Sequence, residues 1–212
     1  MGRMGRREKR SGGDSGVKRL LDILLALVVA VLFSPILALT ALLVFASLGS
    51  PVLFQQNRAG LEGRSFTLLK WRSMRNATDV HGRLLPDEQR VTRVGLIIRR
   101  FRIDELPSVI NILRGELSFV GPRPLPPGNP INNAHDGARL ALRPGLTGLA
   151  QVSGNTLLSE QEKLAIDLYY IRTRSFIRDV VIIWRTLWTV LQGEMRHEPT
   201  VRHALDMLEK HQ

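Results

Sequence analysis

Cysteine is absent from the 212 residues of the sequence, so neither disulfides nor thiolate metal sites are available. A Walker-type glycine loop, an HExxH motif and paired CxxC motifs are also missing, which leaves ordinary nucleotide hydrolysis and zinc chemistry without support. Histidines are few, fall in expected loop or tail segments, and show no ligand spacing. They are His81, His135, His197, His203 and His211.

Acidic residues are scarce relative to basic ones. Asp and Glu total 19 against 30 for Lys and Arg, which gives a formal net charge of +11. This excess predicts an anionic partner, namely nucleic acid, a phosphate-bearing substrate or acidic lipid. No RNA- or DNA-binding motif is readable, and no aromatic platform is interleaved with the basic residues, so nucleic acid is not an expected partner.

Charge is missing altogether from residues 23–48. At ~1.5 Å per residue a straight helix of this length would cross a ~30 Å hydrocarbon core. Ser34-Pro35 interrupts the run, and Pro35 lacks an N–H and clashes with the preceding turn, so we expect a break that leaves two halves too short to span.

Basic residues flank this apolar run on both sides, which predicts that both of its ends stay cytoplasmic. They are Arg3, Arg6, Arg7, Lys9, Arg10, Lys18 and Arg19 before it, and Arg58, Arg64, Lys70, Arg72 and Arg75 after it. A re-entrant helix meets both constraints, with Ser34 helping to satisfy carbonyls at the break. A kinked transmembrane span remains open, and a cleaved signal is disfavoured by the length of the run.

Composition divides the chain into four parts. Residues 1–17, rich in Gly, Ser and Arg, predict a disordered basic tail, and residues 18–49 predict the membrane helix. Residues 50–193 form the predicted cytosol-facing catalytic domain, and residues 194–212 a polar tail. At 23.8 kDa the chain is long enough for one such domain but short for two.

Local patterns in the catalytic part predict an α+β fold that is mostly helical. Residues 51–54 and 65–69 predict a hairpin, and residues 76–89 a mobile loop. Residues 91–102 and 176–192 place apolar side chains on one side of each helix, as in helices that lie in a membrane interface or pack on a core. Ser159 and Glu162 form a capping box for a further helix.

The sharpest candidate for chemistry is Asp104-Glu105, at the start of a helix predicted for residues 104–113 with Asp104 as its N-cap. Taken alone the pair is weak evidence, because an Asp at an N-cap followed by a Glu in the first turn is more often an ordinary helix start than a catalytic site. Ten Lys or Arg residues between positions 64 and 102 would suit a diphosphate, and a proline-rich loop at residues 120–130 would hold Arg123 in a fixed place.

Six ordered motifs give the chain a resemblance to a known family. They are Lys18-Arg19-Leu20-Leu21-Asp22, Ser34-Pro35, Leu69-Lys70-Trp71-Arg72-Ser73-Met74, Ile103-Asp104-Glu105-Leu106-Pro107, Val120-Gly121-Pro122-Arg123-Pro124 and Arg143-Pro144-Gly145-Leu146-Thr147-Gly148. Across residues 18–193 the chain resembles the small monotopic phosphoglycosyl transferases, the bacterial polyprenyl-phosphate hexose-1-phosphate transferases. The resemblance favours the re-entrant helix, because that family inserts a helix broken at Ser-Pro into one leaflet.

The resemblance also implies an activity at the cytoplasmic face of the bacterial inner membrane. The expected substrates are a UDP-sugar and polyprenyl (undecaprenyl) phosphate, and the expected products are polyprenyl-diphosphate-sugar and UMP, the first membrane step of polysaccharide, O-antigen or glycoprotein assembly. Asp104 would be the nucleophile that carries an aspartyl-phosphosugar intermediate, and Glu105 would bind Mg²⁺. The oligomeric state, including a homo-oligomer, stays open.

The same resemblance assigns the phosphate contacts. Lys70, Arg99 and Arg123 match basic positions of the family pattern, and Arg72 and Arg58 are further candidates for which surface roles fit as well. The chain departs from the pattern after Gln151-Val152-Ser153-Gly154, where Asn155-Thr156 replaces a frequent Arg-Asn, and at Gln55, where Arg is frequent. These departures put sugar recognition in doubt and leave the Asp104-Glu105 dyad intact.

Overall fold

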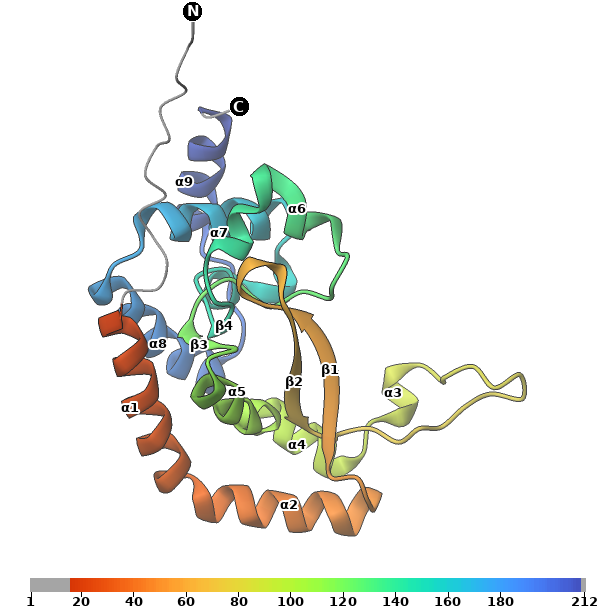
Figure 1. The fold of residues 1–212 in the computed structure, drawn as a ribbon. Helices are drawn as coiled ribbons and strands as arrows, with labels where there is room; N and C mark the ends of the chain where they lie inside the picture. The colour runs from red at the N-terminus through yellow and green to blue at the C-terminus, as the bar shows by residue number, and fades with distance from the viewer. Residues whose placement is uncertain (1–15, 211–212) are drawn as a thin grey trace, which may run out of the picture.

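A computed structural model describes residues 16–210 of the chain, so all but the last two residues of the predicted basic tail lie outside the described part. Figure 1 shows a mostly helical body with two small sheets. The α-helices are α1 (Gly16–Leu32), α2 (Ser34–Leu48), α3 (Asp87–Arg90), α4 (Arg93–Arg100), α5 (Val109–Arg114), α6 (Pro130–Gly137), α7 (Glu160–Thr173), α8 (Phe176–Gln192) and α9 (Glu198–Glu209). The strands are β1 (Leu53–Ala59), β2 (Ser65–Trp71), β3 (Ser118–Val120) and β4 (Gly145–Thr147). The predicted α+β, mostly helical class is confirmed.

The apolar N-terminal run forms two helices with a bend of 63° between α1 and α2. The break falls at Ser34-Pro35 as predicted, and the Ser34 hydroxyl donates to the Val31 carbonyl at 2.7 Å, which satisfies one acceptor released there. Within residues 16–210, no single helix has both the length and the hydropathy to cross a membrane, and by these two criteria only the bent pair taken together would.

Three polar residues near the start of α1 fasten this helix to the body. Lys18 pairs with Asp179 on α8, and Arg19 donates to the carbonyls of Ile112 and Leu113 in the last turn of α5, at 2.6 and 3.0 Å. The buried Asp22 carboxylate accepts a hydrogen bond, at 3.2 Å, from the backbone N–H of Phe119 in β3. The Lys-Arg-x-x-Asp motif therefore docks α1 against three different elements (Figure 1).

The hairpin formed by β1 and β2 positions the segment that follows α4. Strands β1 and β2 pair antiparallel, with Phe54 opposite Lys70. Ser108 donates to the Leu69 carbonyl at 2.7 Å, and the buried Asn111 amide accepts the Leu69 N–H at 3.0 Å. These two side chains lie on one face of the segment formed by the 3-10 helix η2 (Ile103–Ser108) and α5, so they fix the register of residues 103–114 against β2.

A parallel pair of short strands, β3 and β4, brings two glycine backbones into close approach. A Cβ on Gly145 would lie 2.1 Å from the Gly121 nitrogen, and one on Gly121 would lie 2.5 Å from the Arg143 carbonyl oxygen. Only glycine fits at these positions. The close approach places the loop that begins at Gly121 directly against the start of β4.

Among the C-terminal helices, α8 packs against β3 and β4, and α7 packs against α9. The predicted capping box of α7 is confirmed, with Ser159 accepting the Glu162 N–H and Glu162 accepting the Ser159 N–H. Residues after Glu194, taken as a polar tail from their composition, include α9, which packs on α7 and buries Val201 and Ala204. These two apolar residues, three positions apart, lie on the buried face of α9. The overall composition of a segment does not reveal such a spacing.

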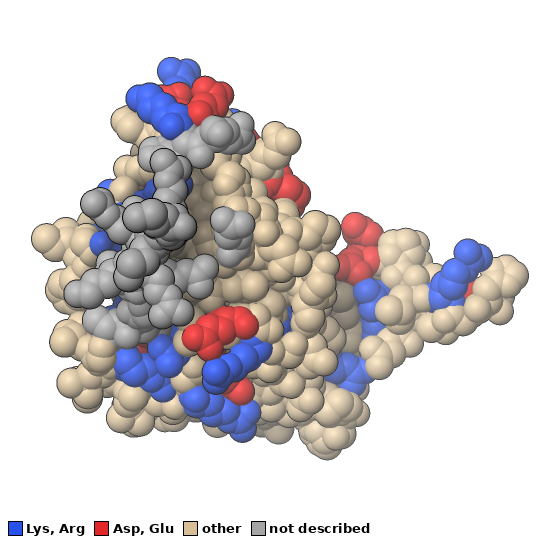
Figure 2. Space-filling view, turned by 45° about the horizontal axis from the view of Figure 1, so that its top comes forward, with Lys and Arg blue, Asp and Glu red and all other residues tan. Residues whose placement is uncertain are grey.

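Large apolar side chains are exposed along four helices. On α8, Trp184 is 69 % and Leu191 70 % exposed, and Leu96 and Ile97 are exposed on α4. Helices α1 and α2 expose most of their leucines and valines. Figure 2 shows, on another face, an arm that projects from the body and carries basic side chains near its tip, and this arm contains α3.

Candidate active site

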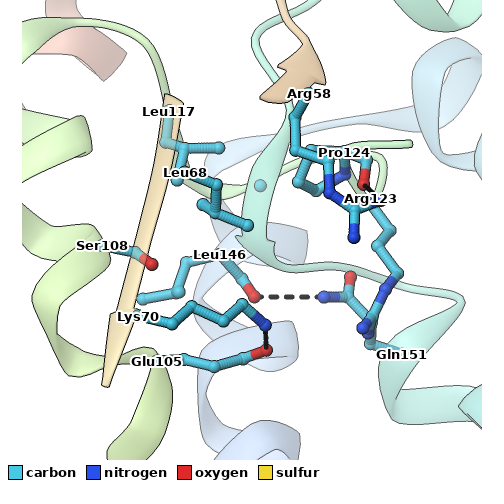
Figure 3. Close-up of a pocket in the computed structure, with 11 residues that line it drawn as sticks. Arg58, Leu68, Lys70, Glu105, Ser108, Leu117, Arg123, Pro124, Leu146 and Gln151 are labelled. Carbon is cyan, nitrogen blue, oxygen red and sulfur yellow. Dashed lines mark hydrogen bonds and ion pairs between the residues drawn. The ribbon is translucent and has the colours of Figure 1, made fainter. Parts of the chain in front are cut away.

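A small pocket that opens to solvent gathers charged residues from four separate segments. Its polar lining consists of Arg58 from β1, Lys70 from β2, Glu105 and Ser108 from η2, Arg123 from the loop after β3, and Gln151. Figure 3 shows these side chains converging, with Lys70 and Glu105 joined as an ion pair. The Lys70 ammonium lies 2.5 Å from Glu105 Oε1, and both side chains are largely buried.

The dyad lies on a 3-10 helix, η2 (Ile103–Ser108), that runs directly into α5. The prediction that Asp104 is the N-cap is wrong, because Arg102 occupies that position with φ 53°, in the left-handed region, and no side chain caps the turn. Pro107 lies inside the 3-10 turn, and α5 ends at Gly115, whose φ of 84° is in the left-handed region. The dyad therefore depends on contacts with β2 and not on a helix N-cap.

The two carboxyl groups of the dyad have opposite electrostatic environments. Burial, followed by the Glu105 charge, raises the pKa of Asp104, although Lys70, Arg99 and Arg102 act against the rise. Burial acts in the same direction on Glu105, but the Lys70 charge and hydrogen bond, with Arg123 and Arg102, bring the pKa of Glu105 below its ordinary value. Neighbouring carboxylates whose pKa values diverge suit two different chemical roles.

Asp104 is half-buried. Among residues 16–210, no hydrogen-bond partner of its side-chain carboxyl group is present. Glu105 lines the pocket, whereas Asp104 is the preceding residue and is absent from the pocket lining. A carboxylate that no neighbour engages keeps its lone pairs for an incoming atom, while Glu105 is held by Lys70.

Arg123 is held through its backbone by a buried ion pair. Arg139 Nε donates to Asp167 Oδ2 at 2.9 Å, and a terminal nitrogen of the same guanidinium forms an ion pair with that oxygen at 2.7 Å and donates to the Arg123 carbonyl at 2.9 Å. Arg139 and Asp167 are each 4 % exposed at the side chain. No local pattern predicts this pair, because 28 residues separate its members. The pair nevertheless fixes the loop that carries Arg123.

The other two predicted phosphate contacts lie elsewhere. Arg99 is exposed on α4 and acts on Asp104 through its charge. Arg72 donates to the carbonyls of Leu48 and Met74, each at 3.3 Å, and does not line the pocket. Arg72 therefore joins the end of α2 to the chain that follows β2.

Glu194 is a neighbour of the dyad that sequence reasoning missed. Its carboxylate accepts from Arg102 at 2.9 Å, from Asn155 at 2.5 Å, and from the amide and hydroxyl of Thr156 at 3.1 and 2.5 Å. Asn155 in turn accepts from Arg123 at 3.4 Å. Asn155, one of the residues at which the chain departs from the family pattern, thus connects Arg123 of the pocket to Glu194.

The acidic residues of this pocket fit a magnesium ion only in company with a substrate. Among residues 16–210, no group of three or more His, Asp or Glu side chains converges as a metal cage. Mg²⁺ is commonly bound by one or two carboxylates together with substrate phosphates and water. The lowered pKa keeps Glu105 ionised, so Glu105 fits as the carboxylate ligand of such a shared ion.

Comparison with known proteins finds a group of similar sequences, of which three follow. The "Uncharacterized sugar transferase EpsL" of Bacillus subtilis is 41% identical over 179 residues, which are 84% of this chain and 89% of that protein. The "UDP-glucose:undecaprenyl-phosphate glucose-1-phosphate transferase" of Caulobacter vibrioides is 42% identical over 192 residues, 82% of this chain and 69% of that protein. The "UDP-N-acetylgalactosamine-undecaprenyl-phosphate N-acetylgalactosaminephosphotransferase" of Aeromonas hydrophila is 39% identical over 188 residues, 84% of this chain and 44% of that protein.

A family model described as Bacterial sugar transferase matches residues 13–193. This range includes α1, the dyad and every polar residue of the pocket. The resemblance found in the sequence motifs is therefore confirmed, and the chain belongs to the bacterial sugar transferase family.

Proposed function

We infer that this chain transfers a sugar 1-phosphate from a UDP-sugar to a polyprenyl phosphate, with undecaprenyl phosphate as the expected lipid, and releases UMP. The names of two relatives describe this reaction for those proteins. The observation that carries the inference is the pocket, in which Arg58, Lys70 and Arg123 surround an ionised Glu105 next to an unengaged Asp104. Three cations in one pocket suit a diphosphate.

The mechanism that we infer has two displacements at one phosphorus. A carboxylate oxygen of Asp104 attacks the sugar-bearing phosphorus, the bond from that phosphorus to the bridging oxygen breaks, and UMP leaves with the electron pair. An oxygen of polyprenyl phosphate then attacks the same phosphorus, and the bond to Asp104 breaks. The product is polyprenyl-diphosphate-sugar, and the Asp104 carboxylate is restored.

The environments of the two carboxyl groups support this division of roles. The raised pKa of Asp104 makes its carboxylate more basic than an ordinary aspartate, and the ionised form is present above that pKa. Lys70 and Arg123 would bind the non-bridging phosphate oxygens, and Arg99 would add charge on the side of Asp104. Glu105 would hold Mg²⁺, which, when bound, neutralises charge on the diphosphate.

The exposed apolar faces support a membrane location for the reaction. Helices α1 and α2, which meet at a bend, expose large apolar side chains, and so do α4 and α8. Exposure of this much apolar surface to water is unfavourable. We infer that α1 and α2 enter one leaflet as a re-entrant pair and that α4 and α8 lie in the interface. The pocket would then face the cytoplasm at the bacterial inner membrane, where a soluble nucleotide sugar meets a lipid phosphate.

A screen of UDP-sugars tests this function directly. Purified protein in nanodiscs is incubated with each UDP-sugar, Mg²⁺ and undecaprenyl phosphate, and released UMP is measured. We expect one or a few UDP-sugars to give UMP together with a lipid-linked sugar diphosphate. Absence of UMP release with every UDP-sugar, from protein whose thermal transition shows that it is folded, would contradict the proposed function.

A further inference from the structure

Two pocket side chains each keep one buried polar atom without a hydrogen-bond partner among residues 16–210. They are Gln151, through Oε1, and Arg58, through Nε. Gln151 is only 6% exposed. Leaving a buried polar atom unpaired costs about 1–3 kcal/mol, so such atoms at a pocket wall indicate where a ligand supplies the missing partner.

The orientation of the Gln151 amide is set by its other end. Gln151 Nε2 donates to the Leu146 carbonyl at 3.1 Å, and a flipped amide would bring two oxygens together there. Gln151 Oε1 is therefore a fixed acceptor. Figure 3 shows the amide between Arg58 and the Lys70–Glu105 pair, with the bond to Leu146 dashed.

Arg58 requires the opposite kind of partner. Its two terminal nitrogens donate to the Pro124 carbonyl at 3.2 Å and to Gln56 at 2.6 Å, which leaves Nε to bind an acceptor. Burial, and then the nearby Arg123 charge, lower the pKa of Arg58, so an anion placed between the two arginines would relieve their repulsion. A phosphate oxygen has the required charge and acceptor capacity.

One ligand that satisfies both atoms has a phosphate oxygen next to a hydroxyl or N–H donor. We propose that Gln151 is a substrate-binding residue that accepts a hydrogen bond from a hydroxyl or N–H group beside the phosphate bound by Arg58. In the reaction inferred above, on which this assignment rests, that group belongs to the UDP-sugar. A neutral amide suits the position, because it offers an acceptor without placing a negative charge beside the diphosphate.

The donor group has two sources with the same chemistry. It belongs either to the sugar, as a hydroxyl or an N-acyl N–H near the anomeric phosphate, or to the ribose of the nucleotide. On the sugar this group is on the carbon next to the anomeric ester carbon, whereas the nearest ribose hydroxyl, at C3′, is two carbons from the 5′ ester carbon. The test therefore measures the nucleotide and the whole UDP-sugar separately.

Gln151→Met removes the acceptor at nearly constant volume, and Ser153→Ala is the matched control. Ser153 Oγ is also buried and unpartnered, lies in the same 3-10 turn, and does not line the pocket. With the UDP-sugar that the wild-type protein turns over, we expect Gln151→Met to raise KM about 10-fold with kcat within about twofold, because the bond is made in both ground and transition states. Ser153→Ala should leave both constants unchanged.

Inhibition by UMP separates the two sources. If the ribose supplies the donor, the inhibition constant of UMP rises with KM in Gln151→Met; if the sugar supplies it, only KM for the UDP-sugar rises. Either result supports the assignment. A second measurement leaves the protein intact and compares wild-type KM for the UDP-sugar with that for analogues lacking single hydroxyl groups, one of which should reproduce the KM of Gln151→Met.

The assignment is overturned if Gln151→Met has the same KM as wild type and Ser153→Ala, or if no analogue shows a raised KM. Gln151 Oε1 would then be satisfied by water alone. A lower Tm with unchanged KM would likewise reduce Gln151 to a support for the Leu146 loop. These results leave UMP release by the wild-type protein intact, whereas failure of the proposed function abolishes UMP release in every variant.

Discussion

Helices α1 and α2 and the pocket each lack a partner, but the missing partners are of opposite chemical kinds. Helices α1 and α2 expose apolar side chains and keep few polar groups, which gather at the start of α1. The pocket buries charged and amide groups and leaves Arg58 Nε and Gln151 Oε1 unpaired. Lipid would remove the exposed apolar surface from water, and an anionic ligand would supply hydrogen-bond partners to the buried polar atoms. Each region thus indicates the chemistry of a partner that the chain alone does not supply.

The largest expected effect in the pocket comes from Arg123→Lys. The substitution keeps the charge but loses the planar fork and the contact with Asn155. We expect UMP release to fall about 100-fold, as when one preorganised donor is removed from a developing charge, with an unchanged Tm. Arg64→Lys, at an arginine that is 83 % exposed, is the control and should retain activity. Near-normal turnover of Arg123→Lys would remove Arg123 from the phosphate contacts.

The next effect concerns the contacts that dock α1 on the body. Asp179→Ala removes the partner of Lys18 and an acceptor at 2.7 Å from the buried Tyr170 hydroxyl. We expect a loss of about 2 kcal/mol in the free energy of unfolding, or about 4–8 °C in Tm. Glu160→Ala, which breaks an exposed pair with Lys163, should change Tm little. Equal shifts in the two variants would mean that the α1 contacts are ordinary surface pairs.

A smaller effect separates the two carboxyl groups by pH. Burial is the larger cause of the raised pKa of Asp104 and remains in Glu105→Gln, but the repelling charge of Glu105 is lost. The pKa of Asp104 therefore falls, and the acid limb of single-turnover UMP release should move to lower pH. Glu62→Gln, at an exposed carboxylate, is the control. An acid limb that stays in place or moves to higher pH would contradict the electrostatic coupling.

The smallest effect is expected at the helix break. Ser15→Cys and Arg64→Cys, in a chain without cysteines, should both be labelled by an impermeant reagent in sealed inverted vesicles. Pro35→Ala restores an N–H and removes the ring clash, so a minor fraction of molecules should move toward a spanning form. Opposite labelling of the two cysteines in the unaltered helix would contradict the re-entrant model.

The sequence predicted those features that depend on neighbours a few residues away. The break at Ser34-Pro35, the extent of α8 and the capping box at Ser159 follow from one proline, one helical period and one spacing. The pocket depends on distant contacts, such as Arg102 with Glu194, 92 residues apart. Spacing along one chain does not encode such pairs, so the left-handed Arg102, Gln151 and Glu194 were not predicted.

The dyad shows the same limit at closer range. Its two carboxylates are adjacent in sequence, and the pair was predicted as a candidate from its place at a helix start and from the motif order. Their unequal electrostatic environments depend on Lys70, which reaches Glu105 from β2 across 35 residues of sequence. The register set by Ser108 and Asn111 brings this lysine to one carboxylate and not to the other.

Trapping the covalent intermediate tests the central claim most directly. With UDP-sugar and Mg²⁺ but no polyprenyl phosphate, the wild-type protein should release about one UMP per active site and gain the mass of one sugar phosphate on the peptide containing Asp104. Asp104→Asn should abolish both events, and Glu105→Gln should slow the first while leaving the protein folded. If UMP appears only when both substrates are present, and acid quench traps no adduct on Asp104, the lipid phosphate attacks directly and Asp104 is not the nucleophile.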